Sequence, residues 1–356
     1  MTASAQAASR ETVRAPGYVS RTAGPPGGPA LPRPRGELSG AVLAALASPG
    51  RAGAGLPGTR EAGAADPYGD DLHLALYALY ELHYRGFADV DPDLEWDPAL
   101  LELRAALERR FEAELRAATG PVADVTGALD TLLTGTAEDA DTDVSRFLRR
   151  QGRLWQLREY AALRSLYHLK EADPHAWVIP RLRGRAKAAM VAVEYDEFGG
   201  GRPEGVHAEL FAELMTDLDL DPAYGRYLDQ APAAALAPVN LMSMLGLHRA
   251  HRGALVGHFA AVEVTSSPAS ARLAAALRRT GAGPAAEYFY TEHVEADAVH
   301  EQVVRRDVLG GLLAEEPDLA PDIAFGIHAT THLDTRLAEH LLDLWRSERS
   351  ALRTPL

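Results

Sequence analysis

Two histidines and an aspartate recur at helical spacing near the end of the chain. In the segment YTEHVEADAVHEQVVRRD, His293 is followed by Asp297 after four residues and by His300 after three more. Residues at these offsets line one face of an α-helix over two turns. Imidazole nitrogens and carboxylate oxygens together suit iron, manganese or zinc. The alternative is a solvated polar face, which the neighbouring Glu292 and Glu295 favour, and this segment alone divides evenly between the two interpretations.

A second set of metal-ligand types surrounds a run of three glycines. In EYDEFGGGRPEGVHAELFAELM, Glu204 lies three residues before His207, and Glu197 lies ten residues before it, across Gly199–Gly201. Glu-x-x-His is a ligand unit of di-iron carboxylate bundles. The glycines allow the helix to bend or unwind, which would direct Glu197 and His207 to one point. The alternative is a loop and a capped helix, with Pro203 in the first turn and Glu204 at the positive helix end.

One carboxylate stands in a run of small and apolar residues. Glu263 occurs in LVGHFAAVEVTSSP, where a buried carboxylate is costly unless it is paired or binds a metal. The alternative partner is an arginine of the bundle, Arg249 or Arg252. His258 lies five residues earlier and off the face of Glu263, so we interpret it as helix packing. The three segments together supply three histidines and up to four carboxylates, which is the donor set of a dinuclear rather than a mononuclear site.

The overall composition excludes several other kinds of chemistry. The 356 residues include no cysteine, which rules out disulfides, thiolate metal sites, iron–sulfur clusters and cysteine nucleophiles. Lysine and arginine number 36 against 50 aspartates and glutamates, and the net charge of −14 argues against general nucleic-acid binding. An apolar content of 47% allows a large core, in one large domain or two modest ones. Abundant Ala, Leu, Arg and Glu favour helix over sheet.

Helical periodicity runs through most of the chain from residue 66 onward. For example, Leu100, Leu103, Leu107 and Phe111 form one apolar stripe after Pro98. Similar patterns predict helices over residues 70–87, 98–120, 144–170, 176–198, 203–217, 221–229, 236–264, 268–280, 284–311 and 319–347. The sequence contains no alternating strand pattern and no repeat with a period of roughly 20 to 50 residues. We therefore predict an all-α bundle whose first half braces the second.

The N-terminal segment differs from the rest of the chain. Residues 1–65 are rich in Ala, Gly, Pro and Arg, with GPPGGPALPRPRG at the centre, and hold few bulky apolar residues. We predict a disordered arm there, with a short helix around Ala41–Leu46 as the alternative for part of it. Residues 66–165 are predicted to form a bracing helical region, and residues 166–350 the core that carries the candidate ligands. The chain shows no signal-peptide pattern and no membrane-spanning run, so we expect a soluble, cytoplasmic protein.

The motifs resemble those of a known family. The segments EYDEFGGGRPEGVHAELF, GHFAAVEVTSSP and FYTEHVEADAVHEQV are similar, in that order, to the three ligand-bearing core helices of the haem-oxygenase-like di-iron oxidases and oxygenases, also called iron-containing redox enzymes. Weaker support comes from YELHYRGF and EWDPALLELRAALERRFEAEL upstream, and the resemblance covers about residues 70 to 345. It implies a haem-oxygenase-like helical bundle with a helical N-terminal extension.

The resemblance also implies a role for each motif residue. The matched metal ligands, in the order of the helices, are His207, Glu263, and then His293, Asp297 and His300. The first-helix carboxylate stays open between Glu197 and Glu204, because family members place it at different distances before the histidine. Glu171, in HLKEADPHAW, is a weaker candidate, since the aspartate and proline that follow it indicate a helix boundary.

The activity that the resemblance implies is O2 activation at two Fe(II) ions. The substrate would be a small amino-acid-like or fatty-acid-like molecule, oxidised by N-oxygenation or oxidative C–C cleavage, often in natural-product biosynthesis. An external electron donor is compatible with this chemistry, and apolar stripes between residues 70 and 165 are compatible with a homodimer. We expect neither a nucleic-acid nor a membrane partner. Two alternatives stay open: a haem-degrading enzyme on the same fold, and a non-catalytic helical protein that stores metal or uses it structurally.

Overall fold

The fold is known from a computed structural model that describes residues 20, 28–48, 55–134 and 142–356. Within these ranges the regular elements are helices, and the one β-type pairing is an isolated antiparallel bridge between Phe198 and Val206. The prediction of an all-α protein is confirmed. In the same ranges, no helix is both long and apolar enough to cross a membrane.

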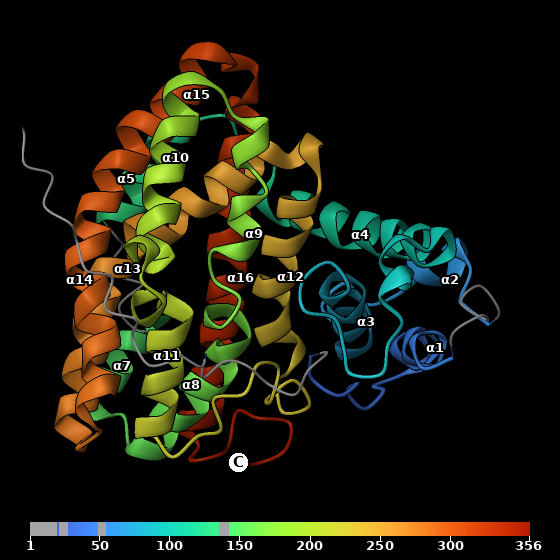
Figure 1. Cartoon of the computed structure of the whole chain (residues 1–356), viewed down its shortest axis with the longest axis horizontal. Helices are drawn as coiled ribbons and strands as arrows, with labels where there is room; N and C mark the ends of the chain where they lie inside the picture. Colours follow the sequence, from blue (N-terminus) through green and yellow to red (C-terminus); the bar gives the residue numbers. More distant parts are fainter. Residues whose placement is uncertain (1–19, 21–27, 49–54, 135–141) are drawn as a thin grey trace, which may run out of the picture.

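Four N-terminal helices form a layer beside the main bundle (Figure 1). They are α1 (Glu37–Leu46), α2 (Thr59–Gly63), α3 (Asp70–Glu81) and α4 (Pro98–Thr119). α1 packs on α3, α2 packs on α4, and α3 packs on α12 (Ala233–Leu247) of the main bundle. α4 begins as its sequence predicts, with Pro98 in the first turn and the Asp97 carboxylate accepting hydrogen bonds from the Ala99 and Leu100 N–H groups.

Part of the predicted N-terminal arm is folded. α1 lies inside the segment 1–65, for which composition predicts disorder, yet its Val42 and Leu46 are fully buried. The disorder prediction is wrong for this helix because most of its residues are apolar, and its buried residues pack against α3. The alternative of a short helix around Ala41–Leu46 is confirmed. The rest of the arm prediction for 1–19, 21–27 and 49–54 lies outside the described residues.

The main bundle surrounds one long central helix, α13 (Figure 1). Its members besides α12 are α5 (Val125–Thr134), α7 (Val144–Gln151), α8 (Leu154–His168), α9 (Asp173–Ala176), α10 (Gly184–Glu197), α11 (His207–Asp217), α13 (Arg252–Thr280), α14 (Pro284–Val303), α15 (Gly310–Glu315) and α16 (Ala320–Arg346). α13 packs against α14, α16, α12 and α7. Where it meets α16, Gly257 and Gly326 allow a close approach, since a Cβ on either would meet a carbonyl oxygen of the facing helix.

A buried ion pair ties the N-terminal layer to the main bundle. Lys170 Nζ lies 2.5 Å from Glu81 Oε2, and both side chains are almost completely buried. The Tyr224 hydroxyl donates a second hydrogen bond to Glu81 Oε2 at 3.0 Å, and the Lys170 ammonium lies 4.3 Å from the centre of the Tyr84 ring. These contacts offset the cost of removing two charges from water. Because Glu81 ends α3 and Lys170 follows α8, the pair fixes the two regions against each other.

Several predicted helices change course inside their ranges. The segment 284–311 forms α14, then a π-helical stretch η6 (Val304–Leu309), and then the start of α15. α13 continues through Pro268, where the sequence pattern predicts two separate helices. Residues 221–229 form turns instead of the predicted helix. Despite these differences, the candidate ligands on α10, α11, α13 and α14 lie in helices.

Candidate metal centre

α14 directs three candidate ligands into the bundle. His293, Asp297 and His300 are 6%, 2% and 3% exposed, whereas Val299 on the same helix is 63% exposed. The neighbouring Glu295 is also exposed. The face that carries the three candidates is therefore buried, and the alternative of a solvated polar face is wrong for these residues.

Neighbouring groups determine which nitrogen each α14 imidazole turns inward. His293 Nδ1 lies 2.7 Å from the Phe289 carbonyl oxygen one turn earlier, so Nδ1 carries the proton and donates it. His293 Nε2 then keeps a lone pair and has no hydrogen-bond partner. In His300 the roles are reversed, with Nε2 3.3 Å from Asp196 Oδ2 and Nδ1 3.4 Å from Glu263 Oε2. Each imidazole offers one nitrogen to the interior while the protein holds the other, as in metal sites.

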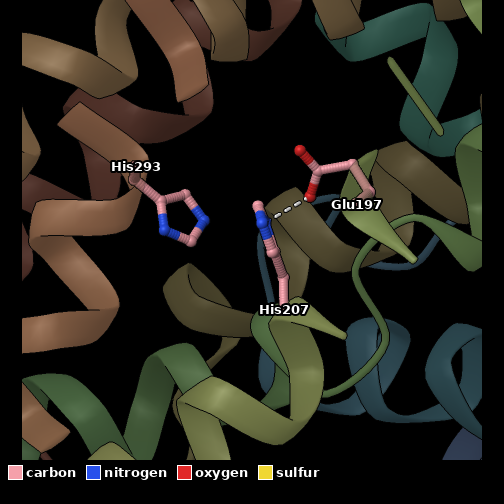
Figure 2. Close-up of side chains that lie close together, drawn as sticks. All are labelled: Glu197, His207 and His293. Carbon is pink, nitrogen blue, oxygen red and sulfur yellow. Dashed lines mark ion pairs between the residues drawn. The ribbon is translucent and has the colours of Figure 1, made fainter. Parts of the chain in front are cut away.

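A turn of glycines brings Glu197 and His207 together. The φ angles of Gly199, Gly200 and Gly201 are +73°, +61° and +80°, a region that side-chain-bearing residues rarely adopt. The chain reverses here between α10 and α11, and Glu197 Oε2 lies 2.7 Å from His207 Nδ1. Figure 2 shows this pair, with His293 facing it from α14. The glycine run thus does what the sequence predicts, by breaking the helix between two donor residues.

Glu263 lies near the middle of the central helix α13 and is 5% exposed. Its Oε2 has no hydrogen-bond partner, and His300 Nδ1 lies 3.4 Å from that atom. Arg252, one of the two arginines considered as a salt-bridge partner, pairs with Glu316 instead. The interpretation of His258 as packing agrees with its position, since its Nδ1 lies 2.8 Å from Thr330 Oγ1.

The donor atoms fall into two groups that share one carboxylate. The groups are Glu197, His207 and His293, and Glu197, Glu263 and His300. In each group one donor atom of every residue lies within 4.8 Å of the others. Asp297 adjoins the second group, with its Oδ1 3.7 Å from His300 Nδ1. Four helices, α10, α11, α13 and α14, therefore converge on a pair of adjacent positions that a carboxylate can span.

The chemistry of these atoms fits a bound metal. Five buried donor atoms lack a hydrogen-bond partner: His207 Nδ1, Glu263 Oε2, His293 Nε2, Asp297 Oδ2 and His300 Nδ1. His207 Nδ1 lies at ion-pair distance from Glu197 but is not aligned for a hydrogen bond. Buried polar atoms are nearly always satisfied, and divalent ions bound by nitrogen and oxygen would satisfy all five.

Without a metal, protons balance the charges of the site. Burial raises the pKa of Glu263 to about 8, although the nearby His300 opposes this. Burial also raises the pKa of Asp297. For the two histidines burial lowers the pKa, but Glu197 beside His207 and Glu263 beside His300 outweigh it, and both pKa values rise to about 9. Since a metal must displace these protons, its affinity is expected to increase with pH.

The two remaining carboxylate candidates lie in different surroundings. Glu204 is exposed in a short 3-10 turn and outside both groups. Glu171 is largely buried, and its Oε2 lies 2.6 Å from His168 Nδ1. Burial raises the pKa of Glu171, but His168, His293 and His207 together hold it well below its ordinary value. Glu171, unlike Glu204, therefore lies within the electrostatic reach of two candidate ligand imidazoles.

Three further residues of α10 lie next to Glu197 and are not among the candidate ligands above. Glu194, one turn before Glu197, is 2% exposed with neither carboxylate oxygen hydrogen-bonded. Asp196 is the partner of His300 described above. Tyr195 is 57% exposed, and its hydroxyl donates a hydrogen bond to the Gly200 carbonyl oxygen at 2.6 Å. The signal for Glu194 is its spacing from Glu197 on one helix, which puts the two side chains on neighbouring turns.

The comparisons with known proteins agree with this geometry. The family model for iron-containing redox enzymes matches residues 158–335, which is half of the chain. The chain belongs to this family. The matched range of this iron-containing redox enzyme runs from α8 into α16 and contains every residue of the two donor groups. None of the curated proteins matches the chain. Family membership confirms the predicted haem-oxygenase-like fold and implies iron as the metal.

Proposed function

We propose that this iron-containing redox enzyme is a non-haem di-iron oxidase or oxygenase. It would activate O2 and oxidise a small amino-acid-like or fatty-acid-like metabolite, by N-oxygenation or oxidative C–C cleavage. The observation that carries the proposal is the pair of buried donor groups with Glu197 in common. A haem requires one axial histidine beside a wide slot, whereas here imidazoles and carboxylates from four helices converge on one small region.

The donor groups indicate which residues would hold each iron. His207 and His293 would hold one ion, and Glu263, Asp297 and His300 the other, with Glu197 in reach of both. Two Fe(II) ions held there would supply electrons for the reduction of O2. Oxygen and nitrogen donors of this kind are the usual set for two iron ions in helical bundles.

The protein contributes orientation and exclusion of water. The Phe289 carbonyl holds the His293 ring, and Asp196 holds the His300 ring, so each presents a fixed nitrogen without reorganisation. His207 and Glu197 are 4% and 6% exposed, which keeps bulk water from the donor atoms and strengthens the electrostatic interactions among them. A dry, fixed environment of this kind limits side reactions with water.

Anaerobic reconstitution with Fe(II), followed by mixing with O2 in the presence and absence of candidate substrates, tests the proposal. We expect two irons per chain and O2 consumption that depends on substrate. Saturation at one iron would reduce the site to a mononuclear one. Metal binding without substrate-dependent O2 consumption would favour the non-catalytic alternative, and a haem absorbance band in the purified protein would favour haem degradation.

The partners in this proposal are a small-molecule substrate and an external electron donor. The donor would be needed wherever the substrate supplies fewer electrons than O2 reduction consumes, and omission of reductant from the assay tests this requirement. The region 66–165 is proposed as the contact between two copies in a homodimer, and light scattering of the full chain measures that mass.

A further inference from the structure

A half-open cavity of about 340 Å³ lies where the N-terminal layer meets the main bundle. α12 runs between α3 and α16 in this part of the fold (Figure 1). The walls come from the turn before α3, from α3 itself, from the first turns of α12 and from α16. Among the described residues, the lining includes none from α10, α11, α13 or α14, so the cavity is separate from the metal centre. Its volume is large enough for a small molecule.

His73 of α3 is 0% exposed and lines this cavity with a donor that has no acceptor. The Asn240 side-chain nitrogen lies 2.9 Å from the His73 carbonyl oxygen and 3.1 Å from His73 Nδ1, so the amide donates to both. Burial lowers the pKa of His73 to about 4, although the Pro67 carbonyl and Asp70 oppose this. The ring is therefore neutral, with its proton on Nε2, and Nε2 has no hydrogen-bond partner. A buried N–H group without an acceptor is costly.

Arg336 of α16 brings a positive charge to the same cavity. Its guanidinium lies 3.7 Å from the centre of the Tyr68 ring, and across the described part of the chain it forms no ion pair. Of the acids nearby, Glu114 is engaged by an arginine of its own helix, and Glu339 is exposed on α16. Arg336 is close enough to His73 to add to the lowering of its pKa. A guanidinium stacked on a ring keeps its edge N–H groups available for a carboxylate.

Asp70, the acid in the lining, is already neutralised. Its Oδ2 lies 2.9 Å from Arg353 Nε, and its Oδ1 lies 3.5 Å from Arg35 Nη1. The same Oδ1 accepts a hydrogen bond from the Ala233 N–H at 2.6 Å, so Asp70 caps the start of α12. Ala234, the next residue of that first turn, also lines the cavity. The positive end of a 15-residue helix therefore adds to an environment that favours an anion.

We propose that the cavity binds a small organic monocarboxylate. Its oxygens would accept hydrogen bonds from the Arg336 guanidinium and from His73 Nε2–H, which gives both groups the partner that they lack. Arg336 is the only arginine or lysine among the described lining residues, and one positive charge favours a singly charged ligand over phosphate. Ala237 and Leu333 offer apolar contacts to a short carbon skeleton. The site does not depend on bound iron.

Calorimetric titration of the full chain with acetate, butanoate and benzoate tests the site. Acetamide, butanamide, benzamide and inorganic phosphate serve as comparisons. We expect one carboxylate per chain, bound at least about tenfold more tightly than its amide, because hydrogen bonds to ionised groups are the stronger ones. The affinity should be the same with and without added Fe(II). Carboxylates that bind no better than their amides, or only in the presence of Fe(II), would overturn the proposal, as would phosphate that binds more tightly than every carboxylate.

Variants of the lining locate the bound carboxylate. Arg336→Gln should bind it at least about tenfold more weakly, because the amide lacks the charge. Ala234→Leu should fill the space while keeping α12, since leucine is a strong helix former. Arg349 is exposed just after α16, so Arg349→Gln should bind as the wild type does. Wild-type affinity in Arg336→Gln would overturn the proposal. Should that variant not fold, wild-type affinity in Ala234→Leu would overturn it instead.

The position of the ligand has a consequence for the contact between the two regions. His73 belongs to the N-terminal layer and Arg336 to the main bundle, so a carboxylate held by both should strengthen their contact. Hydrogen exchange should therefore show residues 70–81 of α3 better protected with benzoate than without it. α14 lines no part of the cavity and should not change. Unchanged protection of α3 at saturating benzoate would contradict a ligand that lies between the layer and the bundle.

Discussion

α14 and the α10–α11 segment supply the same kinds of donor atom to one site by different means. α14 carries His293, Asp297 and His300 on one face of an unbroken stretch of helix, so their spacing in sequence is their spacing in space. Between α10 and α11 the helix is broken by glycines, and Glu197 meets His207 only because the chain reverses. The first arrangement depends on helical periodicity, and the second depends on three backbone conformations.

This difference determines which substitutions would displace the donor residues in each half of the site. A helix face tolerates changes in its exposed residues, since the i→i−4 hydrogen bonds hold the donor residues in register. The glycine turn has no comparable set of hydrogen bonds. A side chain at one of its positive-φ positions strains the short backbone segment that joins Glu197 to His207. The experiments below test this contrast, from the largest expected effect to the smallest.

Replacement of Glu197 by Gln should have the largest effect. Glu197 belongs to both donor groups, so the loss of its charge should weaken both irons, by about 100-fold or more. Glu204→Gln is the comparison, because Glu204 is exposed and outside both groups. Anaerobic Fe(II) titration measures both variants. Equal losses in the two variants, or a loss in Glu204→Gln alone, would show that the carboxylate of the broken segment has been misassigned.

Gly199→Ala should disrupt the broken segment while leaving α14 intact. Gly199 has a φ of +73°, and a Cβ there would press against the backbone of Gly205 and Val206. We expect the fold to lose about 1–3 kcal/mol and the iron held by His207 to bind more weakly. Gly63→Ala is the control, since a Cβ at Gly63 meets nothing within 4 Å. Normal iron loading in Gly199→Ala would mean that the turn adapts without moving its donors.

The pH dependence of stability should change in Glu263→Gln. The folded pKa of about 8 exceeds the ordinary 4.5, so the Glu263 contribution to stability is complete below pH 4.5 and is lost as pH rises through 8. The metal-free wild type should therefore lose stability over this window, by up to about 1.4 kcal/mol for each unit of pKa difference. Glu263→Gln lacks this group and should show a flatter profile, with weaker iron loading and wild-type helical content.

Chemical denaturation at several pH values measures that profile. His207 and His300, whose folded pKa values are also raised, contribute in the same direction between pH 6.5 and 9, and they remain in the variant. Glu339→Gln should follow the wild type. Identical slopes for Glu263→Gln and the wild type would show that Glu263 is paired in solution by a group other than the site histidines.

The smallest expected effect is on the dynamics of α14. Asp297 is buried beside other carboxylates, and without metal their repulsion should loosen this part of the helix. Hydrogen exchange should show residues 290–303 better protected in Fe(II)-loaded than in metal-free protein under anaerobic conditions. The helix α4, which carries no residue of the donor groups, serves as a reference whose protection should not change. Equal protection of 290–303 in both states would indicate that α14 is preformed and rigid.

Much of the site on α14 could be predicted from sequence because periodicity alone places its donors. The convergence of Glu197 and His207 could be proposed, but the choice between Glu197 and Glu204 could not be made. That choice depends on the φ angles of three glycines, which composition does not determine. The structure brings Glu197 into both donor groups and leaves Glu204 at the surface.

Other features depend on contacts between distant segments. α1 lies in an N-terminal segment whose Ala, Gly and Pro content predicts disorder, yet its Val42 and Leu46 are buried and it packs on α3, which follows later in the chain. The isolation of Glu194 is visible only once its neighbours are known to be acids of its own helix and of two other segments. Local pattern therefore identifies helices and their faces, while pairing between segments decides which polar residues are left without partners.

The π-helical stretch Val304–Leu309 has a consequence for how this protein can vary in length. A π turn holds about one residue more than an α turn, so it behaves as a single-residue insertion within a continuous helix. It lies after the last α14 donor, which confines the insertion to the part of the helix beyond the site. Removal of one residue from this stretch would restore α-helix and rotate α15 by about 100° while leaving His293 and His300 in register. Relatives that differ by one residue here can therefore share the same ligands, and their sequences must be aligned with a gap between 304 and 309.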